Sequence, residues 1–239
     1  MENVIISAIF IGGATLAGSL VGVILGKRCE SYLGMILAFA AGVMLLAAIS
    51  GLILPSIEGA DVFGIFLSVL GILAGAAVLY LTDKISPLLS GDSGARAALL
   101  FALAVAIHNL PEGIAAGIGY GAGDIGAAAR VTLGIALHNI PEGMIVTVPL
   151  VSSGVKPLKA FMLAASGGIA EVLGSFIGYY AARVAVLLLP FTLAFAGGTM
   201  LYAISAELIP ESQACGRRRA AMALLIGFSV MLFISAIMS

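Results

Sequence analysis

The six residues His108–Gly113 (HNLPEG) return thirty positions later as His138–Gly143 (HNIPEG). In each copy His and Glu are four residues apart, so on a helix both side chains leave from the same face. Each copy lies within a long apolar stretch, where burying these groups is costly unless a bound ion or mutual pairing compensates them. Two such faces brought together would form a metal-binding cavity at the centre of a bilayer.

Three of the expected helices carry glutamates at one depth. With flanking charges and turn glycines as markers, the midpoints of three apolar stretches fall beside Glu112, between His138 and Glu142, and at Glu171. Carboxylate oxygens and neutral imidazole suit a divalent transition metal, zinc among them, and amides can add neutral oxygens. The predicted metal ligands are His108, Asn109, Glu112, His138, Asn139, Glu142 and Glu171. Five or more ligands leave room for two adjacent ions, or for one ion with bound water.

A proline precedes the glutamate in each copy of the repeat, at Pro111 and Pro141. Proline has no N–H and conflicts with the carbonyl four residues earlier, here those of Ile107 and Leu137. At membrane depth such a carbonyl is tolerated only where it is buried in protein or lines a wet cavity. We therefore expect the cavity at these prolines; the alternative is a kink that merely aids packing.

The composition indicates a polytopic membrane protein. Of 239 residues, 62% are hydrophobic and 10% are charged, with a mean hydropathy of +1.20; soluble domains carry roughly 25% charged residues. The net charge of −1 gives no indication of nucleic-acid binding. Cys29 and Cys215 are interpreted as incidental free thiols, because two cysteines give no disulfide framework.

Eight segments are long enough to span a bilayer as helices, which takes about 20 apolar residues each. They are 4–26, 32–55, 63–82, 97–121, 125–150, 158–181, 185–208 and 219–238. The first is too long for a signal-peptide core and lacks a basic leader, so it is expected to be a retained span. The connectors are short, which predicts a single eight-helix domain over residues 1–239.

The positive charges predict the orientation. Nine basic residues fall on one side of the expected bundle: Lys27, Arg28, Lys84, Arg96, Lys156, Lys159, Arg217, Arg218 and Arg219. The other side has only Arg130 and Arg183. The basic side should face the cytoplasm, which puts both termini outside.

The second and seventh segments resemble each other. Residues 38–45 (AFAAGVML) align without a gap with residues 194–201 (AFAGGTML), and each segment then reaches a proline followed by a glutamate. The two segments should run in opposite directions, as should the two segments that carry the repeat. Inverted repeats with polar sites at mid-membrane are typical of secondary transporters. Chance similarity between Ala/Gly-rich helices is the alternative.

These residues resemble the ZIP (Zrt-, Irt-like) metal transporters, and are most similar to the prokaryotic GufA-like subfamily. The resemblance rests on the doubled HN-x-PEG motif, Glu171 within SGGIAE, and the AELIPE end of the seventh segment. It implies eight helices with both ends outside, in inverted three-helix units around central helices four and five. The positions that match the family's two-metal site are His108, Asn109, Glu112, Asn139, Glu142 and Glu171. His138 matches a position that varies in the family.

The resemblance further implies that Zn²⁺, or in some members Fe²⁺, Mn²⁺ or Cd²⁺, is carried into the cytoplasm, often by a dimer. The chain departs from the family in lacking its His-rich cluster, since its only histidines are His108 and His138. We expect a transporter in a prokaryotic plasma membrane, with metal and lipid as partners and no resident cofactor. Two alternatives are an intramembrane metalloenzyme, against which no HExxH motif is present, and a protein that holds a fixed structural or sensing metal.

Overall fold

The structure is a computed structural model. It describes residues 1–26, 31–89, 95–123, 125–184 and 188–237. Within these ranges the side chains of 82–83, 85–89, 95–105, 107–108, 127, 184 and 189 are left out of the description.

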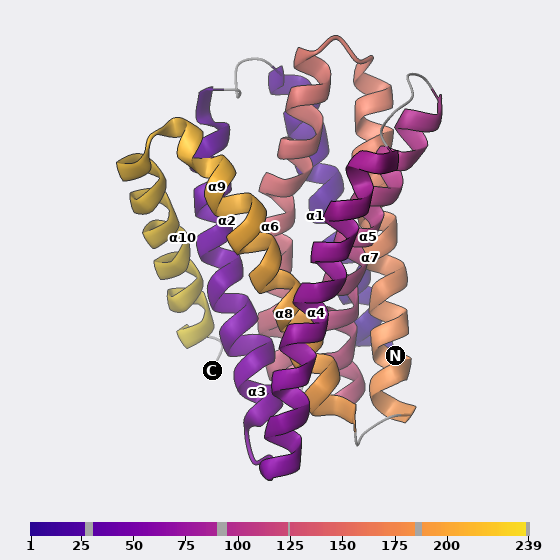
Figure 1. The fold of residues 1–239 in the computed structure, drawn as a ribbon, viewed down its shortest axis with the longest axis vertical. Helices are drawn as coiled ribbons and strands as arrows, with labels where there is room; N and C mark the ends of the chain where they lie inside the picture. Colours follow the sequence, from indigo (N-terminus) through magenta and orange to yellow (C-terminus); the bar gives the residue numbers. More distant parts are fainter. Residues whose placement is uncertain (27–30, 90–94, 124, 185–187, 238–239) are drawn as a thin grey trace.

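Every regular element in the described ranges is a helix, and the helices form one bundle (Figure 1). Six spans are continuous helices: α1 (Glu2–Leu25), α4 (Val62–Leu89), α5 (Ala95–Ala122), α6 (Ile125–Ser152), α7 (Pro157–Val184) and α10 (Arg217–Ile237). Two spans are interrupted by a π-helical turn. One comprises α2 (Leu33–Ala48), η2 (Ile49–Ile53) and α3 (Leu54–Ile57), and the other α8 (Leu189–Ala203), η4 (Ile204–Leu208) and α9 (Ile209–Ser212). A short 3₁₀ turn, η5 (Gln213–Cys215), leads to α10.

The predicted all-helical, eight-span membrane fold is confirmed. Among the described residues, seven of these spans are long and apolar enough to cross a membrane. The eighth is α5, which covers the expected segment 97–121 and packs along α7. One boundary was wrong: α4 continues to Leu89 rather than ending near residue 82. Polar residues such as Thr82 and Lys84 end an apolar stretch, but they do not end a helix.

The two halves of the bundle pack in the same way. Helix α1 packs along α6 as α7 packs along α5, and α2 packs along α10 as α8 packs along α4. The π-helical turns also correspond, because Pro55 and Pro210 each follow a turn by two residues. A π-helical turn and a proline both interrupt the regular ladder of backbone hydrogen bonds. These paired features support the inverted repeat that the sequence predicts.

Glycines set the close contacts between the paired helices. A Cβ atom on Gly18 in α1 would collide with the backbone of Ile140 in α6, and one on Gly174 in α7 with the backbone of Leu110 in α5. Gly18 and Gly174 are 156 residues apart, the same spacing that relates residues 38–45 to 194–201. Without side chains at these positions, α5 and α6 are each held backbone to backbone against a partner helix.

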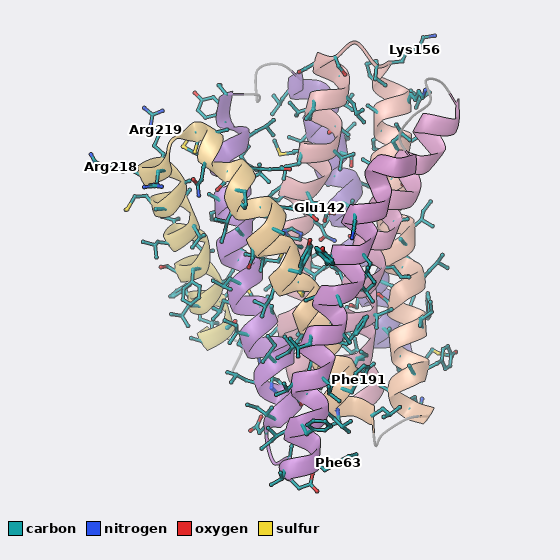
Figure 2. All side chains as sticks on the ribbon, in the orientation of Figure 1. Phe63, Glu142, Lys156, Phe191, Arg218 and Arg219 are labelled. Atoms are coloured by element: carbon teal, nitrogen blue, oxygen red, sulfur yellow. The ribbon has the colours of Figure 1, made fainter. Side chains whose placement is uncertain are left out.

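Three of the basic residues that were predicted to share one side lie at the same end of the bundle. Lys156, Arg218 and Arg219 lie at one end, and Phe63 and Phe191 at the other, with Glu142 between them (Figure 2). Both termini lie in the same half of the bundle (Figure 1). Lys27 and Arg28 lie outside the described residues. Which end faces the cytoplasm stays a prediction.

Candidate metal centre

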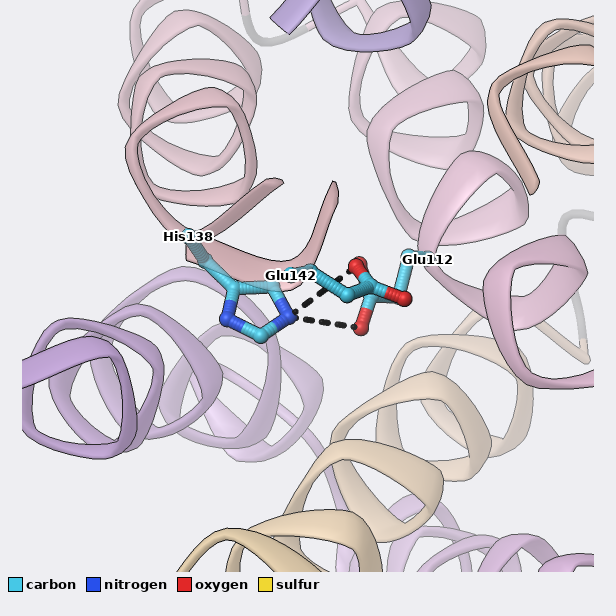
Figure 3. Close-up of side chains that lie close together, drawn as sticks. All are labelled: Glu112, His138 and Glu142. Carbon is cyan, nitrogen blue, oxygen red and sulfur yellow. Dashed lines mark ion pairs between the residues drawn. The ribbon is translucent and has the colours of Figure 1, made fainter. Parts of the chain in front are cut away.

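Three side chains of the doubled motif meet between α5 and α6. Glu112 comes from α5, and His138 and Glu142 come from α6, one helical turn apart (Figure 3). The Nε2 atom of His138 lies 3.5 Å from Oε1 of Glu112 and 3.4 Å from Oε2 of Glu142. One ligand atom from each of the three residues lies within 4.8 Å of the others. We call these three residues the central cluster.

The central cluster is buried, with 2% of Glu112, 1% of His138 and 9% of Glu142 exposed. Among the described residues, both carboxylate oxygens of Glu112 and both ring nitrogens of His138 lack a hydrogen-bond partner. A buried polar atom without a partner carries a desolvation cost of roughly 1–3 kcal/mol, and more where it is charged. Two close carboxylates also repel each other in a medium of low dielectric. A cation between these atoms would remove both costs.

The spacing within the central cluster fits a small tetrahedral ion. Zinc lies about 2.0–2.2 Å from the oxygen and nitrogen atoms that bind it, so two of its tetrahedral ligands lie about 3.4 Å apart. The two distances from His138 Nε2, 3.4 and 3.5 Å, match this separation. Two carboxylates also balance the charge of one divalent ion when the imidazole is neutral. The donor set of two oxygens and one nitrogen therefore suits zinc or a similar transition metal.

Glu171 forms a separate group beside the central cluster. It is fully buried on α7, and its Oε1 accepts a hydrogen bond of 2.7 Å from Nδ2 of Asn109. The hydroxyl of Thr15, on α1, lies 3.1 Å from Oε1 and 2.9 Å from Oε2 of the same carboxylate. Glu171 therefore has protein donors on both oxygens, in contrast to Glu112.

The asparagines of the two motif copies have different partners. Asn109 donates to Glu171, whereas Nδ2 of Asn139 donates to the backbone oxygen of Ile11 in α1 at 3.1 Å. Both asparagines are fully buried, and the amide oxygen of each lacks a hydrogen-bond partner among the described residues. Each amide oxygen therefore remains available to an ion.

The seven predicted ligands are thus placed as follows. Glu112, His138 and Glu142 form the central cluster on α5 and α6, while Asn109, Asn139 and Glu171 are buried on α5, α6 and α7 respectively. His108 is in α5, but its side chain lies outside the described residues. Of the two cysteines, Cys215 is a partly buried free thiol and Cys29 lies outside the described residues.

Sequence reasoning missed Thr15. The signal that could have found it is the spacing of 156 residues, which relates Thr15 to Glu171. Residues 12–22 (GGATLAGSLVG) and 168–178 (GIAEVLGSFIG) share glycine, alanine, glycine, serine and glycine at that spacing. Thr15 and Glu171 occupy the same position in this pattern.

A cavity of about 260 Å³ lies between α5, α6 and the interrupted span α2–η2–α3. Its lining includes Gly51, Pro55, Glu58, Ala115, Gly119 and Val131. Ala115 is one helical turn beyond Glu112 on α5, toward the end of the bundle that carries Glu58. The cavity therefore extends from the exposed Glu58 to Ala115, and the central cluster does not line it.

Comparison with known proteins gives a consistent result. Residues 89–235 match the family described as ZIP Zinc transporter. The zinc transporter ZIP11 of Xenopus tropicalis is 31% identical to the chain, over 92% of each sequence. The zinc transporter GufA of Myxococcus xanthus is 38% identical over 66% of each sequence. The zinc transporter ZupT of Chlorobaculum parvum is 31% identical over 95% of this chain and 94% of its own length.

Proposed function

The chain belongs to the ZIP zinc transporter family and is a multi-pass membrane protein, and from that premise we propose that it carries zinc from outside into the cytoplasm. The transported ion binds at the central cluster of Glu112, His138 and Glu142. The observation that carries this proposal is the buried spacing of 3.4 and 3.5 Å between ligand atoms on two helices.

A second ion fits beside the first. Glu171 and the amide oxygens of Asn109 and Asn139 lie on the helices that form the central cluster or pack against them. Carboxylates can bridge two ions, so Glu112 or Glu142 would serve both. The metal is cargo rather than a resident cofactor. Fe²⁺, Mn²⁺ and Cd²⁺ are further candidate substrates, because such ligands separate first-row divalent ions only weakly.

The proposed direction of transport rests on the basic residues at one end of the bundle and on the position of the cavity. Lys156, Arg218 and Arg219 lie together at one end of the bundle, which is therefore assigned to the cytoplasm (Figure 2). The cavity that contains Glu58 then lies on the outer side, where its carboxylate would attract cations from the medium. The membrane is the plasma membrane of a prokaryote, and both termini lie outside.

Transport is favoured over the two alternatives. All of the relatives described above are named as zinc transporters, which argues against an enzyme. A fixed structural metal would require ligands that do not exchange, whereas a cavity here extends to Ala115, one helical turn from Glu112. The family resemblance also predicts a homodimer, which stays a prediction.

Uptake of radioactive zinc into proteoliposomes tests the proposal. We expect saturable uptake by the native chain and a loss of at least about a hundredfold in Glu112→Ala and Glu142→Ala, since each substitution removes one of three central ligands. Glu2→Ala is the matched control, because Glu2 is an exposed carboxylate at the start of α1. Uptake that survives both central substitutions would refute the site. Tight zinc binding without uptake would favour a structural metal instead.

A further inference from the structure

Three arginines begin α10, at the same end of the bundle as Lys156. Arg217, Arg218 and Arg219 are exposed, and among the described residues none of them forms an ion pair with a carboxylate. Figure 2 shows Arg218 and Arg219 at the edge of the bundle. Positive charges at the start of a helix are also repelled by the helix dipole. These side chains are therefore available to an anionic partner.

An apolar groove of about 520 Å³ lies beside these arginines, between α2, α6 and α10. Arg219, Ala223 and Ile226 follow the spacing i, i+4, i+7, so they share one face of α10, and Ala223 and Ile226 line the groove. Arg219 is therefore one helical turn from the groove, on the same face of the helix. The other lining residues, which are apolar except for one tyrosine hydroxyl, are Tyr32, Met35, Ile36, Phe39, Leu137, Ile140 and Pro141.

The groove extends over the depth that a lipid acyl chain occupies. Seven residues separate Arg219 from Ile226, which is about 10 Å along a helix, and half of a bilayer's hydrocarbon core is about 15 Å thick. The groove also reaches Ile140 and Pro141, which belong to the HN-x-PEG motif of α6. It therefore runs from the charged end of the bundle toward mid-membrane.

The helices α2 and α10 form one fixed side of the groove. A Cβ atom on Gly227 of α10 would collide with the backbone oxygen of Phe39, and one on Gly42 of α2 with the backbone oxygen of Leu224. These two helices therefore pack backbone to backbone. On the α6 side, 39% of Ile140 stays exposed, so the groove is open to the membrane along this helix.

The charge beside the groove distinguishes between two apolar occupants. A second copy of the chain in the same membrane orientation would bring its own three arginines to the same depth, and like charges repel each other. A phospholipid with net negative charge would instead place its phosphate at that depth, where basic residues attract it. An anionic lipid is therefore the occupant that fits both the groove and the arginines.

We propose that Arg219 and the groove form a binding site for an anionic phospholipid, with the phosphate at the arginines and one acyl chain in the groove. Tyr32, which is 56% exposed at the start of α2, has the amphipathic side chain that is common at membrane boundaries. The acyl chain lies against Ile140 and Pro141, on the segment of α6 that contributes to the central cluster. The lipid site is separate from the metal centre, so the inference goes beyond the proposed function.

Native mass spectrometry of the full-length protein, released from detergent with added lipid, tests the inference. The probes are dioleoyl phosphatidylglycerol and dioleoyl phosphatidylcholine, which have the same acyl chains but differ in net charge. The native chain should bind phosphatidylglycerol at least about fivefold more tightly. In Arg219→Gln that affinity should fall about fivefold, which is the contribution of one basic residue near an anionic surface. The affinity for phosphatidylcholine should stay the same.

Lys156→Gln is the matched control, because it removes an exposed positive charge at the same end of the bundle from a residue that does not line the groove. It should leave both affinities unchanged. Ala223→Phe fills the groove but keeps all three arginines, and it should weaken the binding of both lipids at least about fivefold. A native unfolding temperature shows that each variant is folded.

Three results would overturn the inference. Equal affinities for the two lipids in the native chain, or equal losses in Arg219→Gln and Lys156→Gln, would show that binding does not depend on charge beside the groove. Unchanged binding in Ala223→Phe would show that the lipid is held without a chain in the groove. A lipid-free dimer that dissociates in Ala223→Phe would show that a second copy of the chain fills the groove instead.

Discussion

The helix pairs α1–α6 and α7–α5 are built to the same plan, but the central position holds Thr15 in one pair and Glu171 in the other. In each pair a glycine of the HN-x-PEG motif lies against the partner's backbone: Gly143 against Thr15, and Gly113 against Glu171. A serine four residues later donates to that same backbone oxygen in both pairs, at 2.6 Å from Ser19 and 3.0 Å from Ser175. The backbones correspond, yet one position holds a hydroxyl and the other a carboxylate.

The difference shows that packing and chemistry impose separate requirements. Close backbone contact requires glycine in both pairs, so the repeat is preserved there. A glutamate at position 15 would add a fourth buried carboxylate beside Glu112, Glu142 and Glu171, and buried negative charge is costly without cations to balance it. Threonine adds no charge and supplies a donor to the carboxylate of Glu171.

The requirement for close backbone contact in both helix pairs is tested most severely at Gly18 and Gly174. Gly18→Val and Gly174→Val should each cost more than about 3 kcal/mol, because the added atoms collide with the backbones of Ile140 and Leu110, which cannot move aside as a side chain can. The measurement is the yield of monodisperse protein and its unfolding temperature in detergent. The two variants should fail alike.

Gly13→Val is the control for helix propensity and bulk, since an added Cβ at Gly13 meets nothing within 4 Å. It should fold normally. Normal folding of Gly18→Val or Gly174→Val would show that the close contact is not required in that pair.

The different chemical roles of Thr15 and Glu171 are tested by placing the same residue at both positions. Glu171→Thr places the same residue at both positions and removes the carboxylate that we assign to the second ion. Zinc titration should then show a single step of nearly native affinity, and uptake should fall at least about tenfold. Two binding steps in this variant would show that Glu171 is not needed for the second ion.

The membrane spans and the contact between the two copies of the HN-x-PEG motif could be predicted from the sequence, because both depend on composition and on residue spacing. Hydropathy depends on which residues are apolar, and a spacing of four places His138 and Glu142 on one helix face whatever the rest of the fold does. The depth of Glu171 was also predictable, because flanking charges mark the membrane boundaries on each side of it.

The partner of Glu171 was not predicted, because depth does not specify the direction in which a side chain points. Thr15 is a small polar residue in a mainly apolar helix, and nothing in its local sequence predicts its partner. Its role depends on the contact between α1 and α7. The repeat was recognised in residues 38–45 and 194–201, where the side chains are similar, rather than in α1 and α7. In α1 and α7 the shared residues are small, and the pair that matters chemically, Thr15 and Glu171, is among the pairs that differ.

The smallest expected effect concerns the serines that the two pairs share. Ser19→Ala and Ser175→Ala each remove one hydrogen bond from a side chain to the backbone oxygen four residues earlier. Hydrogen bonds between side chains and neighbouring groups in membrane helices contribute about 0.6 kcal/mol on average, and bonds back to the same helix can even bend it. Both variants should therefore lose at most about 0.6 kcal/mol of stability, by equal amounts, in reversible unfolding in mixed micelles.

Zinc titration should be native in both, since neither hydroxyl touches a ligand atom of Glu112, His138 or Glu171. A larger loss in one variant alone would mean that the two hydrogen bonds are not equivalent. The backbones of the two helix pairs would then not correspond at Thr15 and Glu171.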